Sequence, residues 1–266
     1  MVITGASAGI GKALAEVLSA RGAKLVLAAR RAERLAELNR ALGGGHLAVP
    51  TDVADPVQCE SLVHRTAKRF GRLDTLVCNA GYGILRPVAG TSADELRAMF
   101  QTNVFGTTDC IRAAVPVMRR QEPLAGGWRG QVVIVSSAAA RRGLPYFGAY
   151  SATKAAQLAL AEAMRVELRD DRIAVTSVHP IGTETEFGDV SAGHSGGRRP
   201  TTSGEVRQSA ETVAKSMVRA IERPRPEVWP FRPTRWAVAL GTLMPSVVDR
   251  VLGKRVAVEE GETRGL

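Results

Sequence analysis

Short apolar runs alternate with longer amphipathic stretches along most of the chain. Apolar runs bounded by turn residues predict buried strands, and apolar residues at helical spacing predict helices. The predicted strands are residues 2–3, 24–29, 46–50, 75–78, 131–135, 173–178 and 227–229. The predicted helices are residues 12–21, 31–42, 55–70, 93–120, 151–169 and 211–222. Repeated strand–helix units predict an α/β fold: a doubly wound parallel sheet (Rossmann-like) with helices on both faces, in a single domain.

The pattern changes near residue 230. Residues 1–230 are predicted to form the Rossmann-like domain, and residues 231–266 a C-terminal helical extension packed on that domain, over its pocket or against a partner subunit. The alternative is an amphipathic segment lying on a membrane surface, helped by Arg232, Arg235 and Arg250. We favour the packed extension over peripheral membrane contact.

Composition narrows the class of protein. The 266 residues are 45% hydrophobic and 23% charged, which is typical of a folded globular chain. The net charge of +10 suits an anionic ligand, but no long run of like charges and no cluster of base-stacking aromatics indicates a nucleic-acid partner. Cys59, Cys78 and Cys110 have no metal or redox spacing, and the histidines form no metal motif. We therefore expect reduced thiols, a cytoplasmic location and no metal site.

A glycine-rich stretch, T-G-A-S-A-G-I-G at residues 4–11, joins the first predicted strand to the first helix. Gly5, Gly9 and Gly11 let the backbone turn sharply and approach a ligand closely. The start of the helix then offers N–H groups and a positive dipole end to a pyrophosphate. The alternative is an ordinary strand–helix turn; the flanking strand and helix favour dinucleotide binding.

The end of the second strand bears on the choice of dinucleotide. An acidic residue at this place would bind the ribose 2′-hydroxyl. The chain instead has Ala29 followed by Arg30, and an arginine can pair with a 2′-phosphate. The pattern predicts NADP(H) as the cofactor, with NAD as second choice; the alternative is a solvated arginine.

Tyr150 and Lys154 lie four residues apart, on one face of a predicted helix. An ammonium at about 4 Å would favour the phenolate by about 4 kcal/mol at an effective dielectric near 20, or about three pKa units. Tyr150 is therefore expected to exchange a proton near neutral pH. On spacing alone, an exposed tyrosine beside a solvated lysine is the alternative. Asn103, inside the predicted helix 93–120, would ordinarily point to solvent or bond locally.

Polar and glycine residues follow most of the predicted strands. Parallel strands bring their carboxyl ends to one edge of the sheet, where ligands bind. These residues are the glycine loop, Arg30, Asp52, Asn79, Ser137 and Pro180. The long connection 184–205, rich in Gly, Ser and Thr, is predicted to be a mobile lid over this edge.

Taken together, the motifs resemble the short-chain dehydrogenase/reductase family from residue 2 to about residue 229. Residues 4–11 match its TGxxxGxG loop, and residues 78–81 resemble its NNAG motif with Cys78 in place of the first Asn. Asn103 in TNVFG, Ser137 thirteen residues before Tyr150, and the YxxxK pair match its active-site residues. The chain departs from the family in Pro180-Ile181-Gly182, which replaces Pro-Gly, and in its short first strand.

The resemblance implies hydride transfer between NADP(H) and a carbonyl/secondary alcohol pair. The implied catalytic residues are Asn103, Ser137, Tyr150 and Lys154, with a water held by Asn103 linking Lys154 to solvent. The implied or predicted cofactor-binding residues are Gly5, Ser7, Ala8, Gly9, Ile10, Gly11, Arg30, Asp52, Val53, Asn79, Ala80, Gly81, Tyr150, Lys154, Pro180, Ile181, Thr183 and Thr185.

The remaining expectations concern substrate and partners. By family position the pocket would be lined mainly by apolar residues, which favours a hydrophobic small-molecule substrate: Tyr82, Ala138, Ala139, Leu144, Phe147 and Ile181. The alternative is that these residues only pack the loops. The resemblance also implies a homo-oligomer paired through residues 104–120 and 151–169. A non-catalytic dinucleotide-binding protein is the rival function, and the four intact catalytic positions argue against it.

Overall fold

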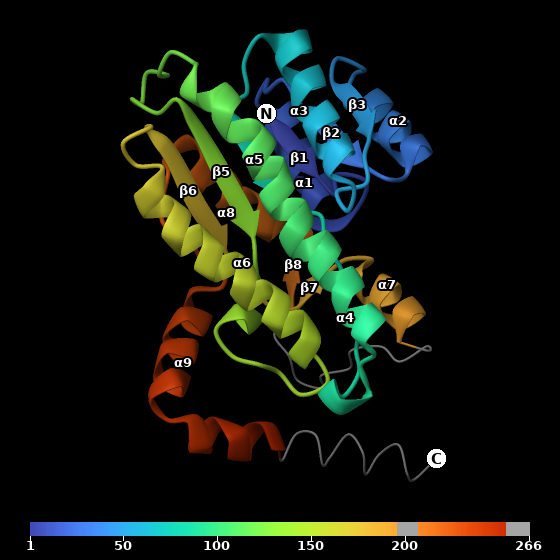
Figure 1. The fold of residues 1–266 in the computed structure, drawn as a ribbon, viewed down its shortest axis with the longest axis vertical. Helices are drawn as coiled ribbons and strands as arrows, with labels where there is room; N and C mark the ends of the chain where they lie inside the picture. The colour runs from blue at the N-terminus through green and yellow to red at the C-terminus, as the bar shows by residue number, and fades with distance from the viewer. Residues whose placement is uncertain (196–206, 254–266) are drawn as a thin grey trace.

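A seven-stranded parallel sheet forms the centre of the molecule (Figure 1). The computed structural model describes residues 1–195 and 207–253. The strand order is β3-β2-β1-β4-β5-β6-β9, and every pairing is parallel. The strands are β1 Val2–Thr4, β2 Val26–Ala29, β3 Leu47–Pro50, β4 Thr75–Cys78, β5 Gly130–Val135, β6 Ile173–Val178 and β9 Glu227–Val228. The predicted doubly wound sheet is confirmed.

Helices cover both faces of the sheet, and each face has its own apolar core. On one face are α1 Gly9–Ser19, α2 Ala32–Ala41 and α8 Ala210–Glu222, which bury Leu14, Leu35 and Met217. On the other are α3 Pro56–Phe70, α5 Gly106–Arg119 and α6 Gly148–Glu167. The strands between them, such as β5 and β6, are buried along their whole length. Removing this apolar surface from water is the main force that holds the layers together.

Local sequence signals set several helix ends. Asp55 caps α3 by accepting hydrogen bonds from the N–H groups of Val57 and Gln58, and Gly71 ends the helix in the left-handed conformation. Ser92 and Glu95 form a capping box at the start of α4 (Ala93–Phe100). Short 3₁₀ turns occur at η1 (Val88–Gly90) and η3 (Ala138–Ala140).

The predicted helix 93–120 is interrupted in its middle. Between α4 and α5 the chain forms a π-helical turn, η2 (Gln101–Phe105). Asn103 in this turn is completely buried, so the expectation of a solvent-facing or merely local asparagine was wrong. The physical reason is that the Asn103 side chain donates to Thr153 and to the Tyr82 carbonyl oxygen, and accepts from the Tyr82 N–H, so it needs no water. The side chains of Gln157 and Thr107 donate to the backbone carbonyl oxygen of Asn103, which compensates for the wider turn.

The described part of the connection after β6 contains regular elements, where the sequence predicted a loop. It contains β7 (Thr183–Glu184), which pairs with β8 (Gln208–Ser209), and the helix α7 (Phe187–His194). The Thr185 hydroxyl accepts a hydrogen bond from the N–H of Phe187 and so helps α7 to begin. Residues 196–206 of the predicted lid lie outside the described residues, and the lid remains a prediction.

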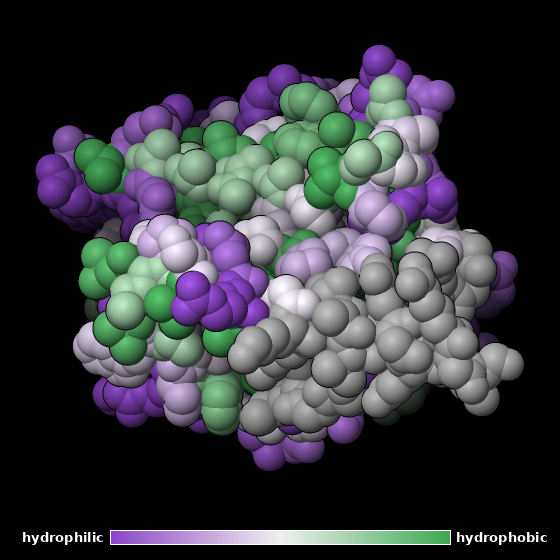
Figure 2. Space-filling view, turned by 90° about the horizontal axis from the view of Figure 1, so that it is seen from below, coloured by the Kyte–Doolittle hydropathy of each residue, from purple (hydrophilic) through white to green (hydrophobic). Residues whose placement is uncertain are grey.

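The C-terminal extension begins with α9 (Arg232–Leu243), and residues 245–253 are also helical. α9 contacts η3, and Arg142 forms an ion pair with Asp249. Apolar side chains stay accessible here, among them Trp236 at 71% and Leu243 at 79%. Figure 2, a view from the end of the molecule where α9 lies, shows a broad apolar band. Both interpretations of residues 231–266 remain predictions; residues 254–266 lie outside the described part.

No helix within residues 1–195 and 207–253 is long and apolar enough to span a bilayer.

Candidate active site

The carboxyl ends of the parallel strands bring the predicted site segments to one rim. Hydrogen bonds connect neighbouring segments directly. The side-chain amide of Asn79, after β4, donates to the Thr4 carbonyl oxygen of β1 at 3.0 Å. The N–H of Ala138, after β5, donates to the Pro180 carbonyl oxygen, after β6, at 2.9 Å. These bonds join the end of β1 to the segment after β4, and the segment after β5 to the segment after β6.

The glycine loop has the shape of an anion-binding cradle. Gly5 has φ of +65°, and a Cβ there would lie 2.9 Å from the Ala80 Cα. A Cβ at Gly11 would lie 2.4 Å from the Gly5 carbonyl oxygen, so any larger residue would displace the backbone. α1 begins at Gly9, and Ala8 occupies its N-terminal capping position. Among the described residues, no side chain at this position accepts a hydrogen bond from the first N–H groups of the helix. This uncapped positive helix end fits a dinucleotide pyrophosphate.

Thr4 connects the glycine loop to the segment after β4, although sequence analysis did not single it out. Its hydroxyl accepts hydrogen bonds from the N–H groups of Asn79 and Ala80, at 3.0 and 3.1 Å, and donates to the Val77 carbonyl oxygen. Thr4 is 2% exposed. Two segments of the predicted cofactor cleft are thus held in a fixed relation by one buried hydroxyl group.

The basic residues after β2 have different surroundings from one another. Arg30 is the residue predicted from the sequence, and its charge acts on Tyr82. Burial raises the pKa of Tyr82, and the charge of Arg30 acts in the opposite direction with a smaller effect. The neighbouring Arg31 is the residue that reaches the glycine loop, where its Nη2 donates to the Ser7 hydroxyl at 3.0 Å. Arg31 and Arg34 also donate to the carboxylate of Glu186, on the segment after β6. The basic cluster at this end of the cleft is therefore larger than predicted.

Other predicted cofactor residues line the loops after β3 and β6. Asp52 accepts a hydrogen bond from the N–H of Ala54 at 3.0 Å, and Val53 is 6% exposed. The Thr183 hydroxyl donates to the Ile181 carbonyl oxygen at 2.8 Å. The side chain of Thr185 lies 3.1 Å from the place of a Cβ on Gly9, so it covers the glycine loop.

Tyr150 and Lys154 both lie on α6, with the Lys154 Nζ 5.6 Å from the centre of the Tyr150 ring. Desolvation raises the pKa of Tyr150 to about 12, while a hydrogen bond with the Ser137 side chain acts in the opposite direction. Burial lowers the pKa of Lys154 to about 7. The expectation that a nearby ammonium would lower the pKa of Tyr150 was wrong for the protein without cofactor. Lys154 is itself desolvated, and it donates to Val135 and Gln157.

A buried polar network joins Lys154 to Asn103. The Lys154 Nζ donates to the Gln157 Oε1 at 2.9 Å, and the Gln157 Nε2 donates to the Asn103 carbonyl oxygen at 2.6 Å. The Asn103 side chain donates to Thr153 and to the Tyr82 carbonyl oxygen. The side chain of Gln157 therefore links Lys154 directly to Asn103. The water that the family resemblance implies between Lys154 and solvent stays a prediction. Gln157 was not predicted, although its spacing of three residues from Lys154 was a signal.

Ser137 is held in place by the imidazole of His179. The His179 Nδ1 lies 3.2 Å from the Ser137 carbonyl oxygen, and the ring stacks on Trp229 with centroids 4.4 Å apart. Desolvation lowers the pKa of His179, so the ring is mostly neutral at pH 7. His179 therefore has a positioning role, which it exerts through the backbone of Ser137.

Aromatic side chains surround the Tyr150 ring. Phe147 lies 5.7 Å and Phe187 5.4 Å from it, measured between ring centroids. A Cβ on Gly83 would lie 3.0 Å from the Tyr150 ring. Phe147 was expected in the pocket, whereas Phe187, on α7, was not. Apolar walls exclude water from the phenol and favour an apolar ligand.

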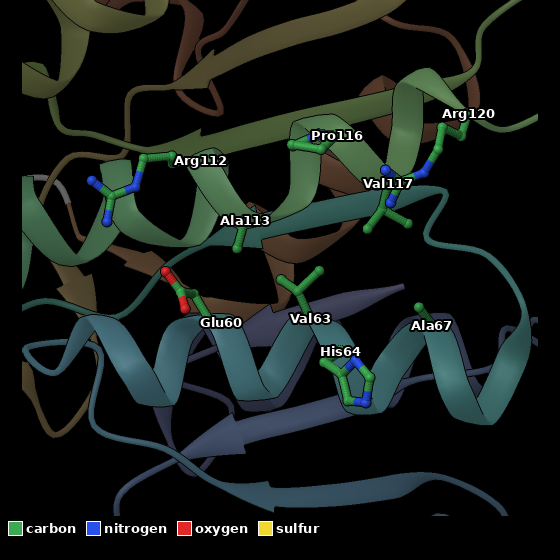
Figure 3. A pocket seen from close by; sticks show the side chains of 9 residues that line it. All are labelled: Glu60, Val63, His64, Ala67, Arg112, Ala113, Pro116, Val117 and Arg120. Carbon is green, nitrogen blue, oxygen red and sulfur yellow. The ribbon is translucent and has the colours of Figure 1, made fainter.

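A hollow of about 320 Å³ lies elsewhere, between α3 and α5. Figure 3 shows side chains of the two helices facing each other across it, including Glu60 and Val63 on α3 and Ala113 on α5. It contains none of the predicted site residues. Among the described residues no group of three or more acidic, histidine or cysteine side chains could hold a metal.

Comparison with known proteins identifies the family. The model of the short chain dehydrogenase family matches residues 1–193. The chain is 32% identical over 272 residues to dehydrogenase/reductase SDR family member 7B of Bos taurus, covering 97% of this chain and 82% of that protein. The protein belongs to the short-chain dehydrogenase/reductase family.

Solved structures agree with this assignment. A short chain dehydrogenase/reductase from Burkholderia phymatum in complex with NAD has a TM-score of 0.80 and 26% identity, covering 92% of this chain and 93% of that chain. An alcohol dehydrogenase from Thermococcus sibiricus complexed with 5-hydroxy-NADP has a TM-score of 0.71 and 28% identity, covering 86% and 94%. The protein is thus an oxidoreductase of this family that takes a nicotinamide dinucleotide.

Proposed function

We propose that the protein is an NADP(H)-dependent oxidoreductase that interconverts a hydrophobic carbonyl compound and a secondary alcohol. The observation that carries the proposal is the convergence of Tyr150, Ser137, Lys154 and Asn103 beside the glycine cradle. A protein that only bound the dinucleotide would have no need of this constellation. Retained binding without turnover on any carbonyl substrate would favour that rival.

The residues of the chain divide the work as follows. The bound nicotinamide would supply or accept the hydride. With a pKa raised to about 12, Tyr150 keeps its proton at neutral pH and acts as the acid that protonates the carbonyl oxygen. The Ser137 hydroxyl donates a hydrogen bond to the same oxygen and stabilises its developing charge. Lys154, fixed by Val135 and Gln157, orients the ribose and supports the proton transfer.

The preference for NADP(H) is supported by basic side chains at the end of β2. Ser7, Arg30 and Arg31 offer a hydroxyl group and two guanidinium groups where a ribose 2′-phosphate would bind. Replacing Ala29, which is 9% exposed, by Asp should repel the phosphate and bind a 2′-hydroxyl instead. Fluorescence titration should show wild-type preference for NADPH and a shift toward NADH in Ala29→Asp. Wild-type preference for NADH would contradict this part of the proposal.

The substrate class is supported by the aromatic surroundings of Tyr150. NADPH oxidation should be faster with bulky aromatic or alicyclic ketones than with short polar carbonyl compounds of equal reactivity. Equal or faster turnover of the polar compounds would contradict a hydrophobic pocket.

Two further parts of the proposal concern the setting of the enzyme. Homo-oligomerisation through α5 and α6 is supported by apolar side chains that are open to solvent at that side, Phe105 at 52% and Val166 at 71%. A cytoplasmic location is supported by three free thiols, Cys59, Cys78 and Cys110. Light scattering of the purified protein checks the first, and fractionation of the native host the second.

A further inference from the structure

An internal carboxylate lies at the basic end of the cofactor cleft. The Arg34 Nη1 donates to the Glu186 Oε1 at 2.6 Å and to its Oε2 at 2.8 Å. The Arg31 Nη1 donates to the same Oε2 at 3.0 Å. These two arginines come from the start of α2 and from the residue before it, whereas Glu186 comes from the segment after β6.

The same cluster includes the glycine loop. Besides Glu186, Arg31 donates through its Nε and Nη2 to the Ser7 hydroxyl at 3.3 and 3.0 Å. The neighbour of Glu186, Thr185, packs on Gly9 of that loop. Two guanidinium groups converge on the carboxylate, and one of them also binds a hydroxyl group. The arrangement suits a phosphate equally well, because Arg pairs with both anions in the same planar geometry.

We propose that Glu186 is an internal competitor of the cofactor phosphate: its carboxylate takes the arginines that a ribose 2′-phosphate needs, and the phosphate must displace it. The inference rests on the proposed use of NADP(H). Glu186 then acts as a specificity-determining residue, because it weakens the binding of NADPH and leaves NADH, which has no 2′-phosphate, unaffected. Displacement would also release the segment that carries α7 and Phe187 from the glycine loop.

The size of the effect follows from the exposure of the cluster. The side chains of Arg31, Arg34 and Glu186 are each between 42% and 45% exposed, so solvent screens the ion pairs. Ion pairs of this kind contribute up to about 1 kcal/mol, which corresponds to about fivefold in a binding constant. Removing the competitor should therefore tighten NADPH binding by about three- to fivefold.

Glu184 provides a matched control. It lies two residues before Glu186 on the same segment, in β7, and its side chain is exposed. Glu184→Gln and Glu186→Gln change the net charge of the protein by the same amount. Any difference in NADPH affinity between the two variants therefore reports the position of the carboxylate and not the net charge of the protein.

The experiment compares wild type, Glu186→Gln and Glu184→Gln by isothermal titration with NADPH, NADH and adenosine 2′,5′-bisphosphate. We expect Glu186→Gln alone to bind NADPH and the bisphosphate about three- to fivefold more tightly, with NADH unchanged. Equal NADPH affinity in the two variants would overturn the inference while leaving the proposed function intact.

Hydrogen exchange of the protein without nucleotide gives an independent result. The amides of α7 should exchange faster in Glu186→Gln than in Glu184→Gln, because the carboxylate no longer holds the segment. Equal exchange rates of the α7 amides in the two variants would overturn the inference that Glu186 holds this segment, even if no nucleotide bound. Failure of wild type to bind any nucleotide would contradict the proposed function instead, and this outcome is distinguishable from the first two.

Discussion

At the scale of the residue, the proposed chemistry rests on two titratable side chains, the half-buried Tyr150 and the buried Lys154. Tyr150 is shifted toward its protonated form, and Lys154 toward its neutral form, because both lose water in the fold. The sequence identified the pair correctly, but spacing alone could not reveal how far Lys154 is desolvated. Spacing also could not reveal the bond of Gln157 to Asn103 or that of Glu186 to Arg34, since these partners lie about 50 and 150 residues away in the chain.

Lys154 should make stability depend on pH. Its pKa is about 7 in the folded protein against 10.5 for the free side chain, so between these values the unfolded chain binds a proton that the folded protein has released. The free energy of unfolding should therefore rise with pH from 7 to 10 in wild type without cofactor. Relative to Lys154→Met, the rise in Tm should reach at least about 2–4 °C, which corresponds to 1 kcal/mol in a domain of this size. The same dependence of Tm on pH in wild type and Lys154→Met would contradict the lowered pKa of Lys154.

Gln157 should control the charge of Lys154. Gln157→Leu removes an acceptor of the ammonium, so the pKa of Lys154 should fall further; Gln157→Glu places a carboxylate there and should raise it. Loss of a hydrogen bond to a charged group costs about 1.5–3 kcal/mol, so kcat in Gln157→Leu should drop by roughly tenfold or more. The measurement is the pH dependence of kcat/KM, with NADPH affinity as control. Identical pH profiles in the two variants would show that Gln157 has no such role.

At the scale of the element, the start of α1 and the π-helical turn η2 position residues of the candidate active site. The strand–helix alternation, the bounds of α3 and the order of the motifs could be predicted, because periodicity and turn residues are local signals. The π-helical turn η2 could not, because it depends on Gln157 and Thr107, which satisfy the Asn103 carbonyl oxygen from α6 and α5. α7 was likewise missed, since its sequence has few apolar residues at helical spacing.

The glycine loop gives a prediction at this scale. In Gly11→Ala the new Cβ would lie 2.4 Å from the Gly5 carbonyl oxygen, so the backbone of the cradle must shift. Overpacking of this kind costs about 1–3 kcal/mol. NADPH affinity should fall at least tenfold, as measured by titration, together with a lower Tm. Gly143→Ala is the control, because its Cβ would meet open space; NADPH affinity equal to that control would contradict the cradle.

At the scale of the whole molecule, the chain carries an excess of basic residues. The net charge of +10 favours negatively charged ligands in general. The fold class and the order of motifs along the rim followed from the sequence because the whole chain repeats one strand–helix unit. The placement of residues 231–253 did not follow, because their apolar residues fit both a covered and an open surface.

Salt should affect the two cofactors differently. The exposed arginines Arg31 and Arg34 are screened as ionic strength rises, and only NADPH carries the 2′-phosphate that would use them. Between 50 and 500 mM NaCl, NADPH affinity should fall by a larger factor than NADH affinity. Equal losses would indicate that the basic cluster does not bind the phosphate.

The most direct test of the account is the turnover of Tyr150→Phe. The substitution removes the proton donor and keeps the ring between Phe147 and Phe187. Steady-state NADPH oxidation with a hydrophobic ketone should fall about 10²–10⁴-fold, while titration should show NADPH bound as tightly as in wild type. Turnover within a few-fold of wild type would contradict the assignment of Tyr150 as the acid, and with it the proposed mechanism.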